Sequence, residues 1–176
     1  MSLTPATNRQ VPDHSILDYY NKQVYLGNSY SYGFNGAIAS TAEIPLFLLS
    51  NPLVPGSSFP SGYVSLFLTF SQLAIITASQ SAIVRAYLSP TVTSTGTASV
   101  PLNRRPGSPH TSIAGLYLSP TLSENGNLID LLSASPGFAA YSNQMLIMDP
   151  GQSLLLTVQA SANPTIIGAG LSWYEL

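Results

Sequence analysis

The chain has 176 residues and a mass of 18.6 kDa, which is enough for one domain with its own hydrophobic core. Charged residues make up 7% of it, against about 25% in a typical globular protein, and the net charge is −2. Five basic residues are too few for a phosphate-binding surface, which argues against nucleic acid as a partner, and without cysteine there is no disulfide or thiolate metal site.

Residues 1–28 are predicted to form an extended N-terminal arm outside the core. The stretch contains Pro5 and Pro12 and shows no sustained apolar period. One interpretation is a frayed terminus, and the other is an arm that becomes ordered on a neighbouring subunit. The apolar and aromatic residues that would anchor it are Ile16, Leu17, Tyr19, Tyr20, Val24 and Tyr25.

Residues 29–176 are predicted to form an all-β domain, and no helical period extends over ten residues. The predicted strands are short and separated by Pro, Gly, Asn and Ser at spacings near ten residues, which is typical of an antiparallel β-sandwich or barrel. They are Ile44–Leu49, Tyr63–Phe70, Ala74–Thr77, Ala82–Leu88, Thr95–Val100, Thr111–Leu118, Asn127–Leu132, Gln144–Met148, Ser153–Ala160 and Thr165–Tyr174. The most apolar stretch, residues 63–78, is too short and too polar to span a membrane.

Proline and glycine predict where strands end. Four prolines in residues 44–61 favour an edge strand followed by a loop. The sequence Asp149-Pro150-Gly151 predicts a tight turn, because Pro fixes φ and Gly supplies a positive φ. The sequence Tyr-Leu-Ser-Pro-Thr occurs at residues 87–91 and again at 117–121, and in both places it predicts a strand that ends at Ser-Pro. Chance similarity is the alternative for this repeat.

No residues form a recognisable catalytic or metal site. His14 and His110 lie outside any ligand motif, and both are interpreted as structural or solvated. Two distant carboxylates, such as Glu124 and Asp130, leave open a hydrolase. The stretch Gly33–Gly36 lacks the following helix that an anion site needs, so it predicts a turn or bulge. We expect a protein that is not an enzyme and has no cofactor.

Arginine and tyrosine supply the candidate contact residues. Arg104 and Arg105 form the only basic pair, which is either a solvated loop tip or a contact with another subunit. An aromatic cluster precedes the first predicted strand. It either fills the core or forms an interface, and its position beside the arm favours the interface. Its members are Tyr19, Tyr20, Tyr25, Tyr30, Tyr32 and Phe34.

The C-terminal half resembles small β-sandwich proteins that decorate or cement the capsids of tailed bacteriophages. The resemblance lies in Met145–Val158, in Leu171–Glu175 and in Thr95–Arg104, together with the Ser-Pro strand exits, and it covers roughly Ala82–Glu175. It implies a jelly-roll-like sandwich on the exterior of the virion, commonly as a homotrimer, and it brings no residue-level site. The arm lies outside it.

The leading hypothesis is a structural virion protein that decorates a phage capsid and cements it by bridging capsid subunits. Its expected partners are the major capsid protein and copies of itself, without nucleic acid or membrane. The contact residues would be Ile16, Leu17, Tyr19, Tyr20, Tyr25, Arg104 and Arg105. The alternative is a tail-fibre or receptor-binding module that recognises host surface glycans in an aromatic and amide-lined pocket.

Overall fold

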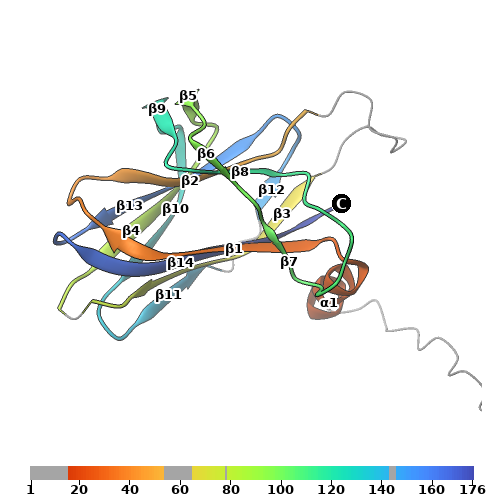
Figure 1. The fold of residues 1–176 in the computed structure, drawn as a ribbon, viewed down its shortest axis with the longest axis horizontal. Helices are drawn as coiled ribbons and strands as arrows, with labels where there is room; N and C mark the ends of the chain where they lie inside the picture. The colour runs from red at the N-terminus through yellow and green to blue at the C-terminus, as the bar shows by residue number, and fades with distance from the viewer. Residues whose placement is uncertain (1–15, 54–64, 78, 143–145) are drawn as a thin grey trace, which may run out of the picture.

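The computed structural model describes residues 16–53, 65–77, 79–142 and 146–176. Within these ranges the chain forms one helix and fourteen strands, which are mostly short (Figure 1). In chain order they are α1 (Ile16–Leu26), β1 (Ser29–Ile38), β2 (Ile44–Ser50), β3 (Leu66–Ile75), β4 (Ala82–Leu88), β5 (Thr91–Ser94), β6 (Thr97–Ser99), β7 (Leu102–Asn103), β8 (Gly115–Leu118), β9 (Thr121–Glu124), β10 (Asn127–Ala134), β11 (Ala139–Ser142), β12 (Leu146–Met148), β13 (Ser153–Ala160) and β14 (Thr165–Glu175).

The strands form two six-stranded sheets that pack as a sandwich. Sheet A has the order β11-β3-β14-β1-β7, with β12 also paired to β3, and sheet B has the order β10-β4-β13-β2-β8-β6. Strands β5 and β9 pair only with each other and form a third, two-stranded sheet, the β5–β9 ribbon. Every pair is antiparallel. The predicted all-β antiparallel sandwich is confirmed.

The core lies between sheets A and B. Trp173 of β14 is 0% exposed, and the ring of Phe47 of β2 meets that of Tyr32 of β1 edge-on at 5.7 Å. Removing so large a buried side chain costs about 3–5 kcal/mol, so these rings contribute strongly to the stability of the sandwich. Trp173 is the single tryptophan of the sequence and lies in the predicted C-terminal strand, so the sequence predicts that it belongs to the core, and the structure confirms this.

Strand β3 replaces two predicted strands because it contains a bulge. Leu68 pairs with Trp173, and Phe70 pairs with the preceding residue Ser172, so one residue of β3 has no partner. The bulge shifts the alternation by one position, and the buried residues change from Leu68 to the odd-numbered Leu73. Because the alternation of buried and exposed residues shifts at the bulge, the sequence of this one strand resembles that of two strands separated by a break.

The expectation of an extended arm is wrong for residues 16–26, which form α1. Ile16, Tyr20 and Val24 stand four residues apart in the sequence, which is a helical spacing, but the helix is short. It ends at Gly27, whose φ of 81° suits the left-handed cap that glycine favours. Residues 1–15 lie outside the described residues, so an extended conformation there stays a prediction.

Two further expectations about strands are corrected. The stretch Gly33–Gly36, expected to be a turn or bulge, lies within β1, where the ring of Phe34 occupies the space that a side chain at Gly36 would need. Strand β2 is central rather than at an edge. Pro45 has no N–H to donate to a neighbouring strand. It is tolerated because β8 pairs with β2 only from Phe47 onward, and because the pairing of β2 with β13 is irregular next to Pro45.

Sheet B has an approximate two-fold relation about an axis between β2 and β13. Strands β4 and β10 occupy the same places on one side as β8 and β6 on the other. Tyr87 of β4 pairs with Leu155, Tyr117 of β8 pairs with Leu48, and Leu155 and Leu48 pair with each other. The repeated Tyr-Leu-Ser-Pro-Thr sequence therefore marks two copies of a three-stranded unit, β4–β5–β6 and β8–β9–β10.

The two copies lock each other at their strand exits. Strands β4 and β8 end directly before Ser89 and Ser119, which have positive φ values of 56° and 49°, so the predicted Ser-Pro exits are confirmed. A side-chain carbon at Gly96 of the first copy would meet the backbone of the second, and one at Gly126 of the second would meet the backbone of the first. Glycine is needed at both crossings because only it allows backbones this close.

Candidate functional site

Helix α1 is fixed to the sandwich at its C-terminal end. The side-chain amide of Asn103 donates to the carbonyl of Gly27 at 2.8 Å, and the backbone amide of Glu175 donates to the carbonyl of Asn28 at 3.0 Å. These bonds join the helix to β7 and β14. Helix α1, β7 and the C-terminal end of the chain therefore lie together at one end of the molecule (Figure 1), which we call the α1 end.

Tyr25 and Arg105 form a stacked pair at the α1 end. The guanidinium of Arg105 lies 5.4 Å from the centre of the Tyr25 ring, a distance at which the cation is attracted to the ring face. The backbone amide of Arg105 donates to the side-chain oxygen of Asn103 at 2.9 Å, which holds the loop in place. Tyr25 is still 74% exposed, so most of its side chain is open to solvent.

The structure brings together only part of the predicted contact set. Tyr25 and Arg105 are in contact, and Arg104 lies on the same loop, where its backbone amide donates to the carbonyl of Ser29 at 2.9 Å. Four predicted residues lie in the first turns of α1, and their side chains are outside the described residues. These four are Ile16, Leu17, Tyr19 and Tyr20.

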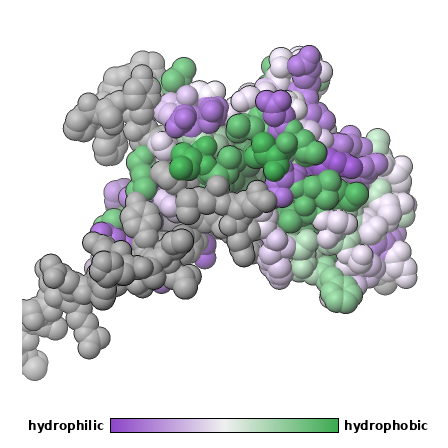
Figure 2. All heavy atoms as spheres, turned by 180° about the vertical axis from the view of Figure 1, so that it is seen from behind, coloured by the Kyte–Doolittle hydropathy of each residue, from purple (hydrophilic) through white to green (hydrophobic). Residues whose placement is uncertain are grey.

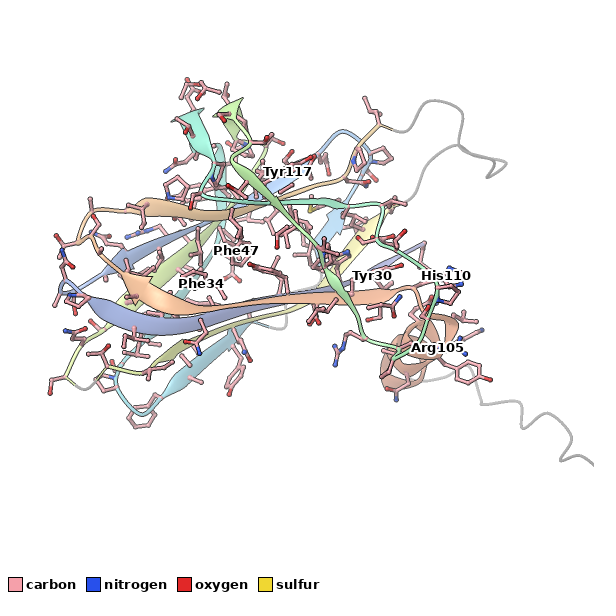
Figure 3. The ribbon with its side chains drawn as sticks, in the orientation of Figure 1. Tyr30, Phe34, Phe47, Arg105, His110 and Tyr117 are labelled. Carbon is pink, nitrogen blue, oxygen red and sulfur yellow. The ribbon has the colours of Figure 1, made fainter. Side chains whose placement is uncertain are left out.

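The interface interpretation is wrong for the later half of the aromatic cluster. Tyr30 is buried in the core, and Tyr32 and Phe34 pack against it (Figure 3). These residues occupy alternate positions of β1, so they all face sheet B. Their aromatic rings stabilise the sandwich instead of forming a free surface.

The carboxylate of Glu175 clamps the segment before β8 to β14. Its oxygens accept hydrogen bonds from the hydroxyl of Ser112, from the backbone amides of Ile113 and Ala114, and from the indole N–H of Trp173. Charge-assisted bonds of this kind are stronger than neutral ones. The sequence gives no local sign of this clamp, because three of the four partners, Ser112, Ile113 and Ala114, lie about sixty residues away along the chain.

A second carboxylate, Glu43, organises a polar network on the outer face of sheet B. It forms an ion pair with Arg85 at 3.1 Å and accepts hydrogen bonds from Tyr87 at 2.9 Å and Thr157 at 2.6 Å. Arg85 also donates to Gln159 at 3.1 Å. Burial, followed by the hydrogen bond to Glu43, raises the pKa of Tyr87 above its usual range. The network ties the β1–β2 connection to β4 and β13.

A cavity of about 270 Å³ lies beside the segment that crosses from sheet B to sheet A. Strand β6 pairs with β8 only as far as Ser99, and Pro101 cannot donate an N–H to continue the ladder, so the chain leaves sheet B and pairs with β1 as β7. The cavity is lined by residues 98–101 and 103, by residues 110–112 and 114–117, and by Tyr30. Figure 3 shows Tyr30, His110 and Tyr117 on the strands and loop that surround it.

His110 is the only histidine whose surroundings are described. It lines the cavity, and its carbonyl accepts a hydrogen bond from Asn103 at 3.0 Å. Across the described ranges, no group of three His, Cys, Asp or Glu residues could hold a metal ion. In the described part of the chain, no helix is long and apolar enough to cross a membrane.

The chain was compared with protein families and with curated proteins. No known protein family matches the chain, and no curated protein matches it significantly. The candidate site is therefore defined by geometry alone, as two neighbouring features: the exposed α1 end with its Tyr25–Arg105 pair, and the cavity beside Tyr30.

Proposed function

We propose that the chain is a non-enzymatic structural protein of a virion, which decorates the exterior of a tailed-phage capsid and cements it by bridging capsid subunits. The observation that carries the proposal is the α1 end, where the Tyr25–Arg105 pair and several exposed apolar side chains occur together. Aromatic residues and arginine are enriched in the energetically dominant positions of protein interfaces. The exposed residues are Tyr25, Leu26, Leu102, Arg105 and Leu176.

Copies of the same chain are the second expected partner. The surface has few charges to keep copies apart, and β10, β11 and their neighbours expose large apolar side chains. On the face seen from behind, hydrophobic residues gather in patches between polar ones (Figure 2). A homotrimer would have a mass of about 56 kDa, three times 18.6 kDa, in light scattering behind a sizing column. A mass of 18.6 kDa would confine self-association to the assembled shell.

The jelly-roll form of the sandwich belongs to the same proposal. Along the chain, β1, β3, β11 and β14 lie in sheet A, and β2, β4, β10 and β13 lie in sheet B. Eight strands divided between two antiparallel sheets are what a jelly roll requires. The β5–β9 ribbon would then be an insertion between β4 and β10.

The carboxylates support a role without catalysis. Glu175 and Glu43 are committed to structural hydrogen bonds, whereas Glu124 and Asp149 are exposed. Asp130 accepts a hydrogen bond from the neighbouring amide of Leu131 at 2.8 Å. A hydrolase would need two carboxylates facing one substrate site, and each of these carboxylates lies in its own local environment.

The test is binding to emptied heads of the virus whose genome encodes this sequence. Tyr25→Ala should weaken co-sedimentation by tenfold or more, since a central aromatic contact is worth 2 kcal/mol or more, as a rough figure. Ile166→Ala is the control, because Ile166 is 41% exposed but lies near the start of β14, at the opposite end of that strand from Glu175 and the α1 end. Equal binding by both variants and the wild-type protein would reject the α1 end as the attachment site, and failure of the wild-type protein to bind would reject the decoration role.

A further inference from the structure

The cavity beside Tyr30 exists because the two copies in sheet B end differently. In the copy β8–β9–β10, the last strand, β10, pairs with β4 of the other copy as far as Ala134 and Ala82. In the copy β4–β5–β6, the last strand, β6, stops pairing with β8 at Ser99, and the chain continues after Pro101 to sheet A. The space that the longer strand would fill is left open at the start of β8.

Tyr30 presents an unused hydrogen-bond donor to this cavity. Its side chain lines the cavity and is only 2% exposed. Its ring stacks at a tilt against Trp173 with 6.2 Å between centroids, but within the described part of the chain its hydroxyl has no hydrogen-bond partner. The hydroxyl oxygen is not fully enclosed, so an acceptor atom of a ligand that enters the cavity can reach it and accept its hydrogen bond.

Tyr30 remains a donor at all physiological pH values. Burial, with a smaller contribution from the nearby carboxylate of Glu175, raises its pKa to about 12. The phenol is therefore protonated, and the ligand must supply an acceptor oxygen or nitrogen. A negatively charged ligand is disfavoured, because the Glu175 carboxylate that contributes to this pKa would repel it.

The remaining lining restricts the ligand further. None of the lining residues is Asp, Glu, Lys or Arg. The lining residues include Ser99 and Thr111, which carry hydroxyl groups, and the aromatic Tyr117, whereas the hydroxyl of the lining residue Ser112 already donates to Glu175. The volume is below the 300–1,000 Å³ or so of pockets that enclose drug-sized ligands, so it suits one ring.

We propose that the cavity binds one uncharged sugar residue of a glycan, with the Tyr30 hydroxyl donating a hydrogen bond to a sugar oxygen. Neutral hydroxyl groups match the uncharged polar lining, and the apolar face of a sugar ring can pack on an aromatic side chain. Asn103 and His110 line the cavity, and Asn103 donates to the carbonyl of Gly27, so this part of the lining adjoins the α1 end. A decoration protein with this site would bind saccharide in addition to capsid.

The test titrates the full-length protein with glucose, galactose, mannose and N-acetylglucosamine and follows backbone amide shifts by NMR. At least one sugar should bind with a dissociation constant of about 1–10 mM, as expected for so small a ligand. The shifts should concentrate in residues 98–103 and 110–117. Tyr30→Phe removes the donor but keeps the ring, and it should weaken binding about tenfold.

Tyr32→Phe is the matched control, since it makes the same change on the same strand outside the cavity lining. It should leave sugar affinity unchanged. The proposal is overturned if no sugar in the panel produces shifts, if the shifts map elsewhere, or if Tyr30→Phe binds as tightly as the wild type. Because these measurements contain no capsid, their outcome is independent of the decoration role.

Discussion

The two halves of sheet B show how one repeated unit can serve two purposes. Around β4, the ladder with β10 is complete, and Arg85 and Glu43 close the outer face with an ion pair. Around β8, the position equivalent to Arg85 is Gly115, the ladder with β6 stops after three residues, and a cavity remains. The first half stabilises the sandwich, and the second leaves room for a ligand.

The difference depends on a few residues. Gly115 has no side chain, and the Tyr117 ring lies over it, where a Cβ at Gly115 would come within 2.8 Å. Pro101 ends the ladder and sends the chain to β1. A cavity can therefore form in an approximately symmetric sheet where one of two equivalent strands, here β6, is shorter than the other.

The largest expected effect comes from breaking the reciprocal crossings. A Cβ at Gly96 would lie 2.1 Å from the carbonyl oxygen of Leu118, and one at Gly126 would lie 2.4 Å from that of Leu88. Gly96→Ala and Gly126→Ala should each lower the free energy of unfolding in urea by about 3 kcal/mol or more.

Gly107→Ala separates the steric clash from the backbone strain. Gly107 also has a positive φ, of 77°, but nothing lies within 4 Å of the place that a Cβ would take there. It should lose only about 1–2 kcal/mol. Equal losses at Gly96, Gly126 and Gly107 would contradict the account of the crossings, and unequal losses at Gly96 and Gly126 would contradict the two-fold relation.

The next effect appears at high pH and belongs to the cavity half. Since folding raises the pKa of Tyr30 to about 12, the unfolded chain loses this proton first as pH rises. Stability should therefore fall between about pH 10 and pH 12, by up to about 2 kcal/mol from this residue. We would measure the unfolding free energy of the wild type and of Tyr30→Phe across this pH range. It should fall more steeply with rising pH in the wild type than in the variant, which lacks the ionisable hydroxyl. Parallel profiles would show that Tyr30 is not the group involved.

Removing the charge of Glu175 should have a slightly smaller effect. Glu175→Gln keeps the shape, but it weakens the bonds from Ser112, Ile113 and Trp173, so we expect a loss of about 1.5 kcal/mol in the free energy of unfolding. Glu124→Gln, at an exposed position, is the control and should change stability by less than about 0.5 kcal/mol. Losses of the same size in the two variants would argue against the clamp.

The ion pair of the complete half should contribute least. The side chains of Arg85 and Glu43 are 18% and 27% exposed, and a pair at such a site is worth about 0.5–1 kcal/mol. A double-mutant cycle with Arg85→Met and Glu43→Gln isolates this coupling in urea unfolding. A coupling energy near zero would show that the attraction between the Arg85 and Glu43 charges does not stabilise the fold, and that the network acts through its hydrogen bonds alone.

Local sequence signals predicted part of this structure. The Ser-Pro exits, the Asp149–Gly151 turn and the buried Trp173 follow from residue types whose backbone preferences or burial are strong, and the structure confirms them. Strand β1 was missed because its glycines look like a turn, although the sheet accepts them. Helix α1 was missed because it is short.

The site was less predictable because it depends on contacts between distant segments. Tyr25 meets Arg105 only because the two-residue strand β7 pairs with β1, and so short a pairing leaves no periodic pattern. One sequence signal for the cavity was available. Pro101 of the first copy occupies the position of Leu131 in the second copy, and β10 continues through Leu131 whereas proline ends a strand. Its consequence depends on where the chain goes next, and that is decided by tertiary structure.

The most direct test of the decoration role is the thermal release of DNA from virus heads with and without this protein. A protein that bridges capsid subunits stabilises the assembled head by its binding free energy. Heads stripped of the protein should release DNA at a lower temperature, and adding back the wild-type chain, but not Tyr25→Ala, should restore the original temperature. An unchanged release temperature in heads that have bound the wild-type protein would contradict the central claim.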